Sequence, residues 1–137
     1  MTNMTNTLET LLSNATLRGT TYTGSRLYMA LFTAAPGEAG GGTEATFTGY
    51  ARVSFRSDIQ ANSDQFSVPD GAGTASNTND LVYAANSGSS QTVTHFAIFD
   101  ASSGGNMLFY GTLAAPKTID PTDIPSFPAG TVRITWN

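Results

Sequence analysis

The residue best suited to acid–base chemistry in this 137-residue chain is its one histidine, His95. An imidazole titrates near neutral pH, so beside a carboxylate it can act as a general base. Asp100 is the nearest carboxylate along the chain, but five residues of extended strand place the two side chains on opposite faces. Ser89 and Ser90 lack the G-x-S-x-G turn that presents a nucleophilic serine. We therefore predict that His95 is a hydrogen-bonded structural residue, that no residue is catalytic and that the protein is not an enzyme.

Ligands for a metal ion or a cofactor are sparse. Zinc sites need several Cys or His ligands, and the chain has one His and no Cys. Two aspartate pairs, Asp120 with Asp123 and Asp64 with Asp70, could offer oxygens to Ca²⁺, but turn formation explains them better than the dense acidic spacing of a calcium loop. The glycine-rich segment 37–42 lacks the Gly-Lys-Ser/Thr ending of a phosphate-binding loop. The sequence predicts neither a metal site nor a cofactor.

A basic and aromatic face is predicted in residues 45–56, where Tyr50, Arg52 and Arg56 alternate with apolar residues. Such a face could bind nucleic acid. Ten acidic residues against six basic ones give a net charge of -4, which opposes binding to nucleic acid or to an anionic membrane. No apolar run reaches membrane-spanning length, and the N-terminus lacks the features of a signal peptide. We expect these side chains to form ion pairs within the chain or with a neighbouring subunit.

Two apolar segments, residues 92–100 and 107–113, predict an antiparallel β-hairpin. Both are rich in β-branched and aromatic residues, and a Ser/Gly/Asn loop separates them. A period of two places Thr92, Thr94, Phe96 and Ile98 on one face, and Val93, His95, Ala97 and Phe99 on the other. A strand that is apolar on both faces needs cover on both. We expect this hairpin in the middle of a sheet or beneath a partner subunit.

Residues 5–16 are the one helical candidate. Apolar residues recur there at helical spacing and form one stripe: Leu8, Leu11, Leu12 and Ala15. Thr5 or Asn6 can cap the helix. Because a three-turn helix is marginal in water, the stripe needs a sheet or a neighbouring subunit to pack on. The candidate interface residues of the chain are Leu8, Leu11, Leu12, Tyr50, Arg52 and Arg56.

The remaining segments predict strands and turns. Residues 26–33, 45–56 and 131–136 are strand candidates, the second with one wet face, and shorter strands are expected near 66–68 and 81–84. No internal repeat and no linker is visible. We predict a single all-β domain over residues 1–137, a β-sandwich or jelly-roll-like barrel of about seven to nine antiparallel strands, with a short N-terminal helix or arm at 1–16.

An ordered series of motifs places the chain beside a known family. The motifs are Leu27-Tyr-Met-Ala-Leu-Phe-Thr33, Pro36-Gly-Glu-Ala-Gly40, Gly42-Thr-Glu44, Gly49-Tyr-Ala-Arg52, Thr92-Val-Thr-His-Phe-Ala-Ile-Phe-Asp-Ala101, Gly104-Gly-Asn-Met-Leu-Phe-Tyr-Gly111 and Lys117-Thr118. Over about residues 8–136 the series resembles a family of small tailed-bacteriophage virion proteins, often labelled tail fibre proteins. Residues 57–80 depart from the family pattern, as does Phe96, where the family often has Trp. The resemblance implies a structural virion protein without catalytic residues.

The resemblance implies a virion component, and the sequence itself suggests which position it takes in the virion. A compact, acidic domain without repeats fits a capsid decoration (cement) protein, which binds the outer surface of the major capsid protein shell and stabilises it by adding buried area across a seam. We also expect it to bind itself as a dimer or trimer, because two-sided apolar strands leave surplus apolar surface. The alternative is a tail fibre or baseplate component that contacts the host through residues 34–44 and 57–80.

Overall fold

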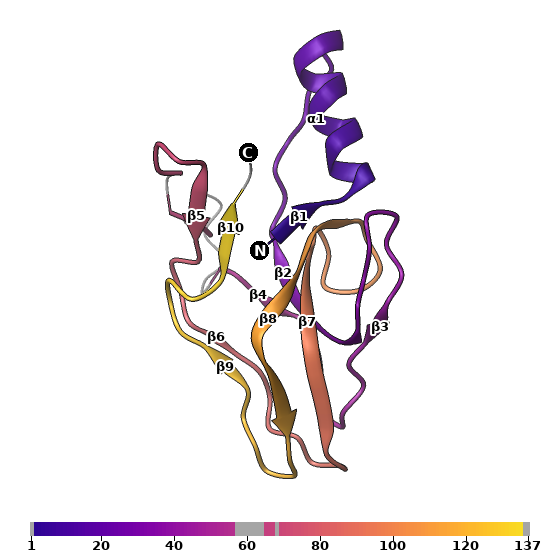
Figure 1. Cartoon of the computed structure of the whole chain (residues 1–137), viewed down its shortest axis with the longest axis vertical. Helices are drawn as coiled ribbons and strands as arrows, with labels where there is room; N and C mark the ends of the chain where they lie inside the picture. Colours follow the sequence, from indigo (N-terminus) through magenta and orange to yellow (C-terminus); the bar gives the residue numbers. More distant parts are fainter. Residues whose placement is uncertain (1, 57–64, 68, 136–137) are drawn as a thin grey trace.

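A computed structural model of the chain describes residues 2–56, 65–67 and 69–135. Its main sheet has the strand order β1-β8-β7-β2-β3, and β4 also pairs with β2 (Figure 1). These strands are β1 (Thr2–Met4), β2 (Tyr28–Ala34), β3 (Thr43–Glu44), β4 (Val53–Ser54), β7 (Gln91–Phe99) and β8 (Met107–Ile119). Two small sheets pair β5 (Thr74–Ser76) with β10 (Arg133–Thr135) and β6 (Leu81–Val82) with β9 (Ser126–Phe127).

The architecture confirms an all-β, sandwich-like fold with one short helix. The part of the chain that the structure describes forms ten strands, slightly more than the seven to nine predicted, because several are only two or three residues long. The strand pairs are all antiparallel. In Figure 1 the two small sheets lie beside the long strands β7 and β8, and α1 (Asn6–Arg18) projects from one end.

The predicted hairpin is confirmed as β7 and β8, and β7 lies mid-sheet between β8 and β2. The predicted facing of Val93 is wrong, however. In the ladder between the two strands, Val93 of β7 pairs with Lys117 of β8, and the next paired residue, His95, pairs with Thr112. This irregularity rotates β7 locally. Val93 therefore joins Phe96 and Ile98 in the main core instead of the opposite face.

Each face of the sheet has its own core. The main core joins Met29 and Leu31 of β2 to Phe96 and Ile98 of β7 and to the irregular layer that carries β5, β6, β9 and β10. The second core is small and consists of Ala30, Phe32, Ala97 and Phe99. The rings of Phe32 and Phe99 stack with centroids 6.4 Å apart, and both alanines are fully buried. Strand β7 of the hairpin is thus covered on both faces by residues of the same chain.

The long strand predicted over residues 45–56 does not form. Only Val53–Ser54 is strand, and a turn lies at 48–49, closed by the Tyr50 amide donating to the Phe47 carbonyl at 2.9 Å. Gly49 makes this turn possible, because its φ is +96° and a Cβ there would lie 2.8 Å from the Ala85 carbonyl oxygen. The face predicted to be wet is consequently turned inward at Tyr50 and Arg52.

Helix α1 follows β1, an edge strand that the sequence did not reveal. Thr5 is the N-cap: its hydroxyl accepts from the Leu8 amide at 3.4 Å and donates to the Met107 carbonyl at 2.6 Å. Gly19 ends the helix in the left-handed conformation, with φ of 68°. Leu8 is the one buried residue of α1. The predicted helix is confirmed, and most of its surface lies outside the domain.

Candidate functional site

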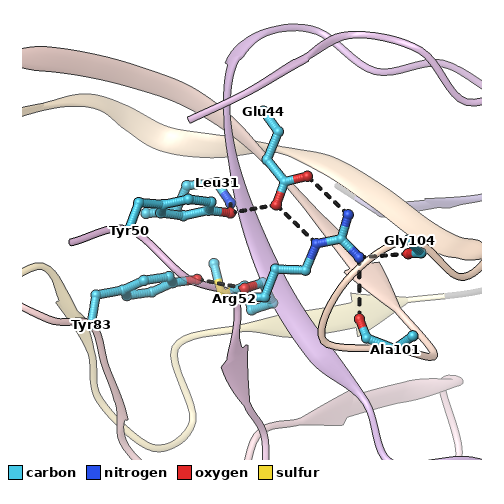
Figure 2. Close-up of polar contacts among 8 residues, drawn as sticks. Leu31, Glu44, Tyr50, Arg52, Tyr83, Ala101 and Gly104 are labelled. Carbon is cyan, nitrogen blue, oxygen red and sulfur yellow. Dashed lines mark hydrogen bonds and ion pairs between the residues drawn. The ribbon is translucent and has the colours of Figure 1, made fainter. Parts of the chain in front are cut away.

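The densest cluster of charged and hydroxyl groups joins Glu44, Tyr50 and Arg52 (Figure 2). The Arg52 guanidinium donates from Nε to Glu44 Oε1 and from Nη2 to Oε2, both at 2.8 Å, which is the bidentate geometry of a strong charge-assisted pair. The Tyr50 hydroxyl donates to Glu44 Oε1 at 2.8 Å and accepts from the Leu31 amide at 3.1 Å. The cluster therefore ties the segment after β3 to the backbone of β2.

Arg52 also holds the loop between β7 and β8. Its Nη1 donates to the carbonyls of Ala101 at 3.1 Å and Gly104 at 2.8 Å, and its Cζ lies 3.5 Å from the centroid of the Phe99 ring. The Arg52 side chain is 8 % exposed and that of Glu44 29 %. A guanidinium buried to this degree needs all of these partners to offset its lost hydration.

The electrostatics of the cluster follow from its contacts. Burial alone would raise the pKa of the Glu44 carboxyl, but the hydrogen bonds from Arg52 and Tyr50 and the charge of Arg52 bring it below its ordinary value. Burial, together with the bond to Glu44, raises the pKa of the Tyr50 hydroxyl. The bond to Glu44 raises the pKa of Arg52. Each group is held in its usual charge state, which suits a structural role and not proton transfer.

Tyr83 extends the cluster into the main core. Its ring stacks on Tyr50 with centroids 6.1 Å apart, and its buried hydroxyl donates to the Met29 carbonyl at 2.8 Å (Figure 2). On the other side its ring meets that of Phe127 edge to face, with centroids 6.2 Å apart. The sequence places Tyr83 in a short predicted strand, and the spacing of the residues gives no signal that it connects two parts of the core.

The candidate interface residues differ in how far the structure exposes them. Leu8 is buried against its own domain, and Tyr50 and Arg52 are engaged in the cluster. Leu11 and Leu12 are 36 % and 37 % exposed. Arg56 is half-buried and does not lie with Leu11 and Leu12. Its part in an interface stays a prediction.

His95 and Asp100 do not form a catalytic pair. The Nδ1 of His95 lies 2.7 Å from the Thr94 hydroxyl, whereas Asp100 accepts from the amide and the side chain of Asn106 at 2.7 and 2.9 Å. Asp100 thus closes the β7–β8 loop, and His95 is hydrogen-bonded as predicted.

The aspartates considered as calcium ligands belong to turns. Asp123 Oδ2 accepts from the Asp120 amide at 2.9 Å, and Asp70 Oδ1 accepts from the Thr74 amide at 2.9 Å. Asp64 lies outside the described residues. Among the residues that the structure describes, no group of three or more His, Cys, Asp or Glu could hold a metal ion. No helix among these residues has the length and apolarity needed to cross a membrane.

The charged cluster of this antiparallel β-domain is engaged in holding segments of the same chain together. The chain itself belongs to the family described as Podophage GP4 fiber I protein gp80, which it matches over residues 3–135. Among curated proteins, no sequence matches it. The resemblance to small tailed-phage virion proteins is thereby confirmed: the protein belongs to a family of structural phage virion proteins that carries a fibre label and is generally non-enzymatic.

Proposed function

We propose that this protein is a subunit of the phage tail fibre and that it associates with a second copy of itself through the exposed part of the α1 stripe. The observation that carries the proposal is the division of that stripe: Leu8 is 4 % exposed, whereas Leu11 and Leu12 are 36 % and 37 % exposed. A helix of this length gains most of its stability from packing, and its own domain fully buries only one of the three leucines. The family description supports the fibre assignment.

The surface around the exposed leucines suits a protein interface. A hollow of about 380 Å³ beside α1 is lined by Met4, Leu8, Leu12, Tyr22 and Phe109. Depletion of charge and enrichment of aromatic and Met side chains are typical of interface cores. Tyr22 is 38 % exposed, so both walls of the hollow offer apolar surface to a partner.

Capsid decoration is the second candidate. It is favoured by the single compact domain without internal repeats, because long fibres are commonly built from repeated units. In that position the protein would bind the outer surface of the major capsid protein and stabilise the shell, and the same α1 face would link copies across a seam.

Locating the protein in the virion separates the two positions. Antibody labelling or a reconstruction of the particle should place it on the tail if it is a fibre subunit. Label or density on the icosahedral shell would contradict the fibre proposal and support decoration.

The role of α1 is tested by the double variant Leu11→Ser/Leu12→Ser. We expect self-association, measured by sedimentation velocity, to weaken at least about tenfold, because two apolar side chains leave the interface. Leu17→Ser is the matched control: Leu17 is 83 % exposed but lies nine residues after Leu8, on the opposite side of the helix. Equal association of native protein and double variant, or an equal loss in the control, would contradict the proposal.

A further inference from the structure

A second cavity, of about 330 Å³, lies between the main sheet and the irregular layer. Its inner walls come from the core, where Met29, Phe96 and Val132 are almost fully buried. Its outer walls come from Leu113 of β8 and Phe127 of β9. Because these walls belong to both layers, the cavity is part of the fold and not a dent in a loop.

The course of β8 explains why a cavity is left here. Strand β1 pairs with β8 only as far as Thr2 opposite Gly111. Beyond this point the pairing of β8 with β7 skips from Thr112 to Lys117, so that residues 113–116 bulge from the ladder. In the described part of the chain no strand pairs with the outer edge of β8 after Gly111.

One basic side chain lines this cavity, and a second lies against the ring of one of its wall residues. Arg133 lines it, and the lining contains no acidic residue. The Nζ of Lys117 lies 5.2 Å from the ring centroid of Phe127, another lining residue. The chain has only six basic residues and a net charge of -4, so two cations beside one apolar cavity are a local reversal of the overall charge.

These two cations lack the partners that fix Arg52. The Nε of Arg133 donates to the Gly130 carbonyl at 3.4 Å, and no carboxylate of the described residues pairs with Arg133 or Lys117. An exposed guanidinium at the rim of an apolar cavity can bind a carboxylate or another anionic head group in bidentate geometry.

We propose that this cavity binds a small anionic amphiphile, with its apolar chain between the layers and its anionic head on Arg133. The volume is at the small end of ligand pockets, ~300–1,000 Å³, and suits a short acyl chain or a small aryl group. Lys117 adds attraction for the same head group. This inference does not depend on the position of the protein in the virion or on the α1 interface.

The test is a titration of the native protein, by calorimetry or NMR, with ligands that share one chain and differ in head group. Decanoate should bind most tightly, decanol more weakly, and decyltrimethylammonium most weakly, because the rim is cationic. Vesicles of phosphatidylglycerol form a separate arm, in which binding of the vesicles but not of free decanoate would show that the protein recognises a lipid surface and would overturn the cavity proposal.

Two variants at exposed positions locate the site. Arg133→Gln should weaken decanoate binding about tenfold and reduce the preference over decanol. Ala114→Phe, at a lining position of the outer wall, should weaken decanoate and decanol alike by filling the cavity. Arg18→Gln, at the end of α1, is the matched control and should bind decanoate as the native protein does. No binding by the native protein, equal binding of all three ligands, or native-like binding by both cavity variants would overturn the proposal.

Discussion

Arg52 and Arg133 carry the same charge, but one is buried among partners and the other is exposed. Arg52 is 8 % exposed, pairs with both oxygens of Glu44 and donates to two loop carbonyls. Arg133 is exposed, makes one long bond to a backbone carbonyl and borders an apolar cavity. The hydrogen-bond donors of Arg52 are thus used inside the fold, whereas most of those of Arg133 are not.

The two regions are connected by a row of aromatic rings. Tyr83 stacks on Tyr50 of the cluster and meets Phe127 of the cavity wall edge to face. Substitutions in the cluster should therefore lower the stability of the core, whereas substitutions at the cavity rim should change the stability of the domain little.

Arg52→Met should have the largest effect, lowering the free energy of unfolding by about 2–4 kcal/mol, because it leaves Glu44 partly buried without its counter-ion and frees the β7–β8 loop. Denaturant unfolding followed by fluorescence measures this change. Arg18→Met, at an exposed helix end, is the control and should stay close to the native value. A loss for Arg52→Met no greater than that of the control would show that the cluster contributes little.

Tyr83→Phe should lower the free energy of unfolding by about 1–2 kcal/mol. The substitution keeps the ring contacts but removes the buried hydroxyl that donates to the Met29 carbonyl, and leaves that acceptor unpaired. Thermal unfolding of both proteins gives the difference. An unchanged stability would mean that this bond does not help to connect the two regions.

Acid should weaken the cluster formed by Glu44, Tyr50 and Arg52. Because the pKa of Glu44 is lower in the folded than in the unfolded chain, its contribution to stability is complete above the ordinary value near 4.5 and is lost as pH falls through the folded pKa. Unfolding curves between pH 7 and pH 3 should show this loss in the native protein. In Glu44→Gln the slope of stability against pH should be smaller over the same window; an identical slope would contradict the assignment.

Arg133→Gln should have the smallest effect, within about 0.5 kcal/mol of the native free energy of unfolding, because an exposed side chain without a counter-ion contributes little to stability. Chemical denaturation checks it. A loss comparable to that of Arg52→Met would show that Arg133 is structural and would remove the contrast between the two arginines.

Much of the fold could be predicted from local patterns. The β7–β8 hairpin and α1 follow from strong periodicity and clear turn and cap residues, such as Thr5. The alternation of residues 45–56 gave a wrong strand, because a close approach at Gly49 depends on the distant Ala85 carbonyl and is invisible in local sequence. The same turn carries Arg52 inward, so the side chain predicted on a wet face became part of the cluster.

The cavity could not be predicted for a related reason. It depends on where the pairing of β8 skips and on where β1 ends, which are properties of the assembled sheet. Arg133 stands in a correctly predicted terminal strand, but its sequence neighbours do not reveal that Lys117 and an apolar cavity lie nearby.

A double-mutant cycle on Glu44 and Arg52 tests whether this cluster supports the domain from within. The free energies of unfolding of Glu44→Gln, Arg52→Met and the double variant should reveal a coupling of at least about 1 kcal/mol. The matched cycle with Glu44→Gln and Arg133→Gln should be additive within about 0.5 kcal/mol, because these two side chains share no partner. Additivity in the first cycle would show that the pair of Glu44 and Arg52 does not support the domain.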